Sequence, residues 1–339
     1  MASIKKTSLK DIARTAGVST ALVSFVLNGK GKEYRINEET ADRILEIARE
    51  MNYQPNQAAK SLRSGRTKTI GLVVSDISNP FFSQLARVLE DEAAKRGYTV
   101  FFGSSDESVD KMERVLNSLI NKGVDGLIIV PCENSEKSIA ALVNNKFPIV
   151  LFDRYFSGIN VSYVALNNYS AAYDATKYLL DVGYKSPGIV AYDINLIHMK
   201  ERIRGYKSAM EDYGKKRSIN VSYLRNDTPQ KSADKILPKM IETGTDAFLF
   251  ATNMISLACL YAIKNMDHDL SSSIGLVGFD GSPAFDFFNP PVSYVKQPIE
   301  VLVHKALQIL IDVIADGNTV QSVLAESEFV INKYMDLKE

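Results

Sequence analysis

Apolar residues in segment 11–28, DIARTAGVSTALVSFVLN, recur at helical spacing in two very short stretches. Ser8 stands where a residue would cap the first helix, Gly17 interrupts the pattern, and Ser19 stands where a residue would cap a second helix. The segment therefore predicts two short helices joined by a glycine turn.

The second of these helices has two unlike faces. Its apolar face would pack on the first helix and contains Leu22, Val23, Val26 and Leu27. The opposite face is short and mostly polar, and it contains Thr20, Ala21, Ser24, Phe25 and Asn28. A third helix is expected from Asn37 to about Met51, and Pro55 ends the unit. This pattern is typical of a helix-turn-helix that enters a DNA major groove; an αα-hairpin in a small bundle is the alternative.

From residue 69 the pattern changes to apolar strands that alternate with helices. A first series contains TIGLVVS, TVFFGSS, GLIIVPC and PIVLFDR, and a second contains GIVAYD, VSYLRND, AFLFAT and IGLVGFDG. Such near-continuous apolar runs are typical of parallel strands that are buried on both faces. The helical segments of the first series are expected at about 80–97, 108–123 and 135–146. The predicted fold class is therefore α/β: a small all-α headpiece followed by two doubly wound parallel lobes, which bind ligands at the carboxyl ends of their strands.

The distribution of charge separates the headpiece from the body. The chain has 339 residues and no net charge, but residues 1–68 contain 13 lysines and arginines against 7 acidic residues. A basic headpiece on an acidic body favours a polyanionic partner for the headpiece. No apolar run approaches eighteen residues and no secretory signal follows Met1, so we expect a soluble, cytoplasmic protein without a membrane partner.

Few residues are arranged for catalysis. His198, His268 and His304 have no evident serine or cysteine partner. Cys132 and Cys259 lie far apart, and the sequence contains no phosphate-binding glycine loop and no zinc-type spacing. We therefore expect no enzyme, no cofactor and no metal site.

Several collinear motifs resemble the LacI/GalR family of bacterial transcription regulators, whose core is similar to periplasmic sugar-binding proteins. They are SLKDIARTAGVSTALVSFVLN, INEETADRILEIAREMNYQPNQAAKSLRSGRTKTIGLVVSDISNPFF, FDR at 152–154, ERIRGY at 201–206, VGFDG at 277–281 and KQP at 296–298. The resemblance covers essentially the whole chain. It implies a headpiece at 1–55, a hinge helix or linker at 56–68, a first subdomain formed by 69–165 and 296–325, and a second formed by 166–295 and 326–339.

The resemblance also implies roles in DNA binding. Thr20 and Ala21 would reach base edges, and Ser19, Ser24 and Asn28 would contact phosphates, which position the helix without reading sequence. The hinge would fold on operator DNA and enter the minor groove, where Leu62 would be wedged between base pairs beside Ala59 and Lys60.

Phe25 departs from the family pattern, in which arginine is usual after VS. A phenylalanine here has two alternative roles. It would contact a thymine methyl group or stack on DNA, or it would pack on the segment 29–35, GKGKEYR, which looks longer than usual.

The implied effector site lies between the two lobes. In SNPFF, residues 78–82, Asn79 would bind a hydroxyl group, and Phe81 and Phe82 would stack on a ring face. The resemblance completes the site with Asp153, Arg154, Arg202, Thr252, Asn253, Asp280 and Gln297; a helix cap is the alternative role for Asn253. Two aspartates offset two arginines in this set, which favours a neutral sugar as the effector.

The sequence as a whole predicts a homodimeric repressor of carbohydrate-utilisation genes that binds double-stranded operator DNA under allosteric control by this effector. No heptad pattern follows EFVINKYMDLKE at the C-terminus, so a dimer rather than a tetramer is expected. A solute-binding protein without DNA function and a sugar-processing enzyme are the alternatives. The effector, the operator sequence, the regulated genes and the choice between induction and corepression stay open.

Overall fold

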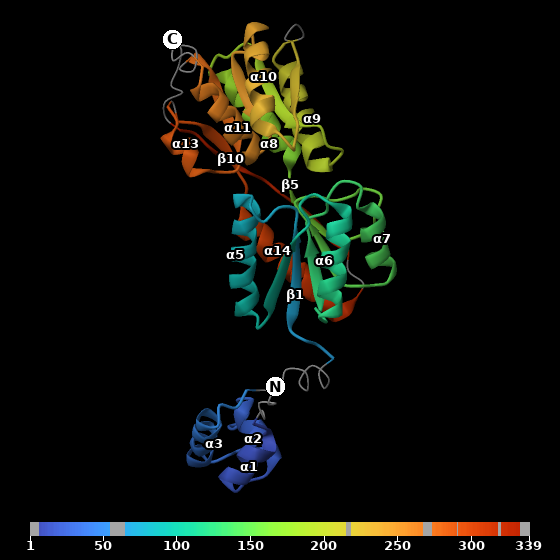
Figure 1. Ribbon diagram of the computed structural model, residues 1–339, viewed down its shortest axis with the longest axis vertical. Helices are drawn as coiled ribbons and strands as arrows, with labels where there is room; N and C mark the ends of the chain where they lie inside the picture. The colour runs from blue at the N-terminus through green and yellow to red at the C-terminus, as the bar shows by residue number, and fades with distance from the viewer. Residues whose placement is uncertain are drawn as a thin grey trace. The chain divides into compact units, whose positions relative to one another are not determined.

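The computed structural model describes residues 7–54, 65–214, 218–266, 273–289, 291–317 and 320–332. The chain forms two compact units, Met1–Thr67 and Lys68–Glu339 (Figure 1). No helix among the described residues combines the length and the apolar character that crossing a membrane requires.

The described residues of the first unit form the helices α1 (Leu9–Ala16), α2 (Thr20–Leu27) and α3 (Glu38–Glu50). Ser8 caps α1 in a capping box with Asp11, and Gly17 ends it in the left-handed conformation at φ 67°. The apolar faces of the three helices meet in one small core that contains Ile12, Ala13, Ala16, Val23, Val26, Ile44 and Ala48.

The first lobe of the second unit has a six-stranded parallel sheet of order β11-β5-β4-β3-β1-β2. Its strands are β1 (Thr69–Val74), β2 (Thr99–Ser104), β3 (Gly126–Ile129), β4 (Ile149–Phe152), β5 (Tyr163–Leu166) and β11 (Ser322–Ala325). Its helices are α5 (Pro80–Lys95), α6 (Val109–Asn121), α7 (Glu136–Asn144) and α14 (Ile299–Asp316). Two separate cores result, because α5 and α14 pack on one face of the sheet and α6 and α7 on the other.

The second lobe repeats this arrangement with a sheet of order β12-β10-β9-β8-β6-β7. Its strands are β6 (Pro187–Tyr192), β7 (Asn220–Leu224), β8 (Ala247–Phe250), β9 (Gly275–Phe279), β10 (Ser293–Lys296) and β12 (Glu328–Val330). All pairs are parallel except that of β12 with β10, which is antiparallel. Its helices are α8 (Asn168–Asp181), α9 (Ile197–Asp212), α10 (Pro229–Glu242), α11 (Asn253–Lys264) and the short α13 (Pro283–Phe287).

The chain passes between the lobes at three places. It leaves the first sheet after β5 and enters the second lobe at α8, returns after β10 to form α14, and crosses again between β11 and β12 (Figure 1). Each lobe is thus completed by segments that are distant in the sequence.

Two strands differ from the expectation that every apolar run is buried on both faces. Phe101 and Phe102 of β2 are 41% and 58% exposed, and Tyr223 of β7 is 44% exposed. Both strands lie at the outer edge of their sheet, where one side has no neighbouring strand and the helices cover less of the surface. The expectation was therefore wrong for these two strands, because an apolar run does not reveal a strand's place in the sheet.

The tight packing of α9 on α8 leads to a stability prediction. A Cβ atom on Gly205 would lie 2.2 Å from the carbonyl oxygen of Tyr169 and 2.9 Å from the amide nitrogen of Tyr173, so relief requires movement of backbone. We expect Gly205→Ala to lower the free energy of unfolding by about 3 kcal/mol. Thermal or urea unfolding of the full chain measures this. Gly158→Ala is the control, because its Cβ would meet no atom within 4 Å; equal stability of the two variants would contradict the packing argument.

Candidate DNA interface and effector cleft

The second helix of the headpiece presents a short, exposed polar surface. Ser19, Thr20, Ala21 and Asn28 are exposed, whereas Val23 and Val26 are buried against the other helices. The hydroxyl of Ser19 accepts a hydrogen bond from the amide of Leu22 at 3.2 Å and so caps the helix. Its hydrogen remains available to donate to an anion at the helix N-terminus.

Ser24 and Asn28 interact with each other at the end of this helix. The amide group of Asn28 donates to the carbonyl oxygen of Ser24 at 2.7 Å and to its hydroxyl at 3.3 Å. The carbonyl oxygen of Ser24 also accepts from the backbone amide of Asn28 at 3.1 Å, so Asn28 is held at the C-terminal end of α2 by both its main chain and its side chain.

The structure shows which neighbour Phe25 has within the headpiece. Its ring is half-buried and stacks on the ring of Tyr34, with 3.7 Å between centroids and 11° between planes. Tyr34 belongs to the segment 29–35, so the packing alternative for Phe25 is the contact that the chain forms. The remaining predicted DNA-binding residues, Ala59, Lys60 and Leu62, lie outside the described residues.

The second unit has a cleft of about 560 Å³ between its two lobes. Four predicted effector residues line it: Asn79, Phe82, Arg154 and Thr252. Most of its walls consist of segments that follow the carboxyl ends of strands in both sheets, as expected for doubly wound lobes. A neighbouring cavity of about 220 Å³ is lined by Phe81, Asp280 and Gln297. Asp153, Arg202 and Asn253 are buried but line neither cavity.

Asp153 and Arg154 form a buried pair after β4. Asp153 is 6% exposed and adopts φ 65°, a conformation that costs a non-glycine residue energy and that clusters at functional sites. Its carboxylate lies 3.4 Å from Nε of Arg154, whose Nη1 lies 2.8 Å from the carboxylate of Glu107. Burial raises the pKa of Asp153, and the two arginines of the site, Arg154 and Arg202, oppose this rise.

Arg202 comes from the second lobe and is 2% exposed. Its Nε donates to the side-chain oxygen of Asn168 at 2.8 Å and its Nη1 donates to the carbonyl oxygen of Ala251 at 2.5 Å. The guanidinium also lies 3.9 Å above the ring of Phe279. Burial lowers the pKa of Arg202, while Asp280 and Asp153 raise it.

Asp280 and Gln297 are joined by a hydrogen bond of 2.7 Å from the amide nitrogen of Gln297 to the carboxylate. Asp280 also has a positive φ, of 61°, and its amide donates to Val295 at 2.8 Å. Burial raises its pKa to about 6, opposed by Arg202 and by the bond from Gln297. The side-chain oxygen of Gln297 is buried and has no hydrogen-bond partner among the described residues.

Several of the predicted effector-binding residues lie at the N-termini of helices. Asn79 caps α5 by accepting from the amide of Phe81 at 3.1 Å, and Thr252 caps α11. Asn253 is therefore the first helical residue and not the cap. Its amide nitrogen donates to Gly281 at 3.3 Å, and its oxygen is buried without a partner. Phe81 and Phe82 are 6% and 3% exposed and pack edge to face.

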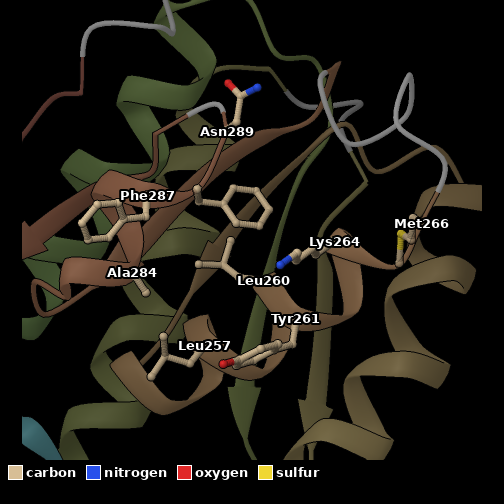
Figure 2. A pocket seen from close by; sticks show the side chains of 9 residues that line it. Leu257, Leu260, Tyr261, Lys264, Met266, Ala284, Phe287 and Asn289 are labelled. Atoms are coloured by element: carbon tan, nitrogen blue, oxygen red, sulfur yellow. The ribbon is translucent and has the colours of Figure 1, made fainter.

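The cleft contains further residues that the sequence did not single out. Glu107 binds Arg154, and Glu133 accepts from the backbone amide of Asn195 across the cleft at 2.7 Å. His198, for which the sequence showed no catalytic partner, also lines the cleft. Its Nδ1 has no hydrogen-bond partner among the described residues, and burial lowers its pKa. One signal was present: Glu133, like Asp153, follows a buried strand, and Glu107 follows the edge strand β2. A second groove, between α11 and α13, lies away from the cleft (Figure 2).

Comparison with known protein families gives two matches that together cover most of the chain. Residues 8–56 match the family described as bacterial regulatory proteins, lacI family. Residues 70–285 match the family described as periplasmic binding protein domain.

Curated relatives match along nearly the full length. The ribose operon repressor of Halalkalibacterium halodurans is 33% identical over 307 residues, which cover 90% of this chain and 89% of that protein. The HTH-type transcriptional repressor PurR of Pasteurella multocida is 28% identical over 331 residues, which cover 96% and 98%.

Solved structures share the fold. The lac repressor dimer bound to operator and the anti-inducer ONPF matches with a TM-score of 0.82 at 19% identity, over 98% of this chain and 99% of that chain. The complex of the transcriptional regulator CelR with cellobiose matches with a TM-score of 0.70 at 23% identity, over 97% and 99%.

The raised pKa of Asp280 leads to a prediction about stability and pH. An aspartate ionises near pH 4 in an unfolded chain, so a folded-state pKa of about 6 favours folding at low pH and disfavours it as the pH rises through 6. We expect thermal unfolding of the wild type to lose stability from pH 4.5 to 7 more steeply than that of Asp280→Asn. Asp286→Asn, at an exposed position of α13, is the control and should follow the wild type. Parallel profiles for all three proteins would argue against the raised pKa.

Proposed function

The chain belongs to the lacI family of bacterial regulatory proteins, and we propose that it represses carbohydrate-utilisation genes under the control of a sugar-like effector bound between its lobes. It is a DNA-binding transcription regulator. The two relatives described above are repressors by name, and the first regulates a ribose operon by name. One combination of features carries the proposal: an exposed recognition surface on α2 and a polar cleft with unpartnered buried groups occur in one chain.

On the headpiece, we assign base contacts to Thr20 and Ala21, which are exposed at the start of α2. Ser19, Ser24 and Asn28 would bind phosphates. Because Phe25 is engaged with Tyr34, it acts mainly by holding the 29–35 segment against α2. For the hinge, the proposal retains Leu62 as the wedge in the minor groove, with Ala59 and Lys60 beside it.

In the cleft, we assign the effector to the polar groups around Arg154, Arg202 and Asp280. Asn79, Phe82 and Thr252 line the cleft and Gln297 lines the neighbouring cavity, while Asp153 and Asn253 are buried polar residues that line neither space. Carboxylates accept hydrogen bonds from hydroxyl groups and guanidinium groups donate to them, so this set suits a polyhydroxylated ligand. Effector binding that favours one orientation of the lobes would change the affinity for operator DNA, because that orientation would also alter how the headpieces meet the DNA.

We further propose that two copies of the chain form the operator-binding unit, matched to a two-fold symmetric site. A groove of about 510 Å³ between α11 and α13 offers an apolar surface for this contact (Figure 2). Phe287 is 88% exposed and Tyr261 is 63% exposed, and burial of such side chains in a subunit interface is favourable.

Operator binding and its control test the central proposal. Footprinting across the genome identifies bound sites, and fluorescence anisotropy then measures affinity for one site. Raising the salt from about 50 to 200 mM should weaken binding by about 10³-fold or more if six or more phosphates are contacted. A sugar that changes this affinity for the wild type should have no effect on Arg202→Ala, although that variant still binds the operator.

Arg204→Ala is the matched control. Arg204 lies on the same helix but is exposed, and it pairs with Glu201 and stacks on Tyr169. Thermal unfolding establishes that both variants are folded. Salt-independent DNA binding would contradict the headpiece assignment, and a normal sugar response in folded Arg202→Ala would contradict the cleft assignment.

Assembly is tested by sedimentation. We expect a dimer at micromolar concentration and a shift toward monomer for Phe287→Glu, because the variant loses an exposed aromatic ring and must remove a carboxylate from water. Tyr223→Glu is the control and should remain dimeric. Tyr223 is also an exposed aromatic residue, but it lies on β7, at the other edge of the second sheet from β12. A stable wild-type tetramer, or a Phe287→Glu dimer of unchanged strength, would contradict this assignment.

A further inference from the structure

Acidic side chains gather at one wall of the effector cleft. The strands β3, β1 and β2 are neighbours in the first sheet, and the segments after their carboxyl ends contribute Glu133, Asp76, Asp106 and Glu107 to the lining. The sequence suggested a balanced site because only two aspartates and two arginines were counted there. These four carboxylates are additional to that count.

Two of the four are neutralised by partners within the lobe. Asp106 forms an ion pair with Lys111, and Glu107 forms an ion pair with Arg154. Asp76 accepts hydrogen bonds from the amide and the hydroxyl of Ser78 at 2.9 and 2.7 Å, and Glu133 accepts from the amide of Asn195. Among the described residues, no lysine or arginine lies within ion-pair distance of either carboxylate.

The facing wall does not supply the missing positive charge. The second lobe contributes only neutral lining residues, which are Tyr192, Ile194, Leu196, His198, Met199, Asn226, Thr252 and Met254. His198 is kept neutral near pH 7, because burial and the nearby Arg154 and Arg202 lower its pKa. The lining residues together with Lys111 thus carry a surplus of two negative charges.

The cleft also has buried polar atoms that form no hydrogen bond with the described residues. The hydroxyl of Ser75 belongs to a residue that is 1% exposed and Nδ1 of His198 to one that is 4% exposed, and neither has a hydrogen-bond partner in the protein. Both residues line the same cavity as Asp76 and Glu133. Leaving such atoms unpaired costs free energy, which a bound polar molecule recovers.

We propose that the effector is a polyhydroxylated molecule that carries a positive charge, an amino sugar in its simplest form, whose ammonium group is bound by the carboxylates of Asp76 and Glu133. This inference rests on the proposed function of the cleft as the effector site. Charge-assisted hydrogen bonds from an ammonium to a carboxylate are among the strongest polar contacts, and the rings of Phe82 and Tyr192 in the same lining also favour a cation. A phosphorylated sugar would meet like charge.

Calorimetry on the full chain tests the inference with matched ligands. Glucose, galactose and mannose are each compared as the free sugar, the 2-amino sugar and the 6-phosphate, at a pH where the amine is protonated. We expect the amino form of the preferred sugar to bind about tenfold more tightly than the free form, as one additional charge-assisted contact allows, and the phosphate to bind most weakly.

Two conservative variants test the negative charge of the carboxylates without changing the size of the side chains. Asp76→Asn and Glu133→Gln each keep an oxygen that accepts from Ser78 or Asn195, so the local turn and the contact across the cleft are retained. Each should reduce the preference for the amino form about threefold to tenfold. Glu90→Gln, at an exposed position of α5 in the same lobe, should leave the preference unchanged.

The outcomes distinguish this inference from the function on which it rests. Equal or tighter binding of the free sugar, tightest binding of a phosphate, or a preference for the amino form that survives both variants overturns the cationic effector and leaves the sugar-responsive cleft intact. Binding of none of the nine ligands overturns both. A preference for the amino form that falls in Asp76→Asn and Glu133→Gln supports the inference.

Discussion

The buried guanidinium of Arg202 is the group around which the start of α8 and the ends of β8 and β9 are organised in the second lobe. A charge removed from water is costly unless it is paired and hydrogen-bonded. Here the second lobe supplies an amide oxygen, a carbonyl oxygen and an aromatic face, and the carboxylates of Asp153 and Asp280 act on it from either side. Because Asp153 belongs to the first lobe and Arg202 to the second, the charge of Asp153 acts on Arg202 across the boundary between the lobes.

This arrangement explains why strained backbone occurs at the same place. Asp153 and Asp280 both have positive φ and each follows a buried strand of a different sheet, β4 and β9. Aspartate tolerates this conformation better than most residues, and the backbone amides of Asp153 and Asp280 hold the two turns by donating to the carbonyl oxygens of Val164 and Val295. Strain of this kind persists only where the surrounding structure enforces it, and here it occurs at two aspartates, of which Asp153 is buried and Asp280 lines the cavity beside the cleft.

The headpiece shows how a substitution within a family pattern is accommodated by the chain itself. A phenylalanine on the recognition helix would expose a large apolar ring to water. The segment 29–35 places Tyr34 over that ring, so that two half-exposed aromatic residues cover each other. Phe25 and the segment 29–35 therefore form one packed feature of the headpiece.

Short-range features of the sequence determined the helices of the headpiece and the buried strands of the lobes. The helix caps, the apolar periods and the turn at Gly17 specify α1 to α3, and the long apolar runs specify the buried strands, because these features depend on neighbours a few residues apart. Tertiary structure decided what depends on distant neighbours: which strands are edges, which loop covers Phe25, and which charges share a cleft. Asp76 is marked in the sequence by its place after the first strand, whereas Glu107 and Glu133 look like ordinary surface acids. They line one cavity only because parallel strands of one sheet end at the same edge, and the order of those strands is set by packing across the whole lobe.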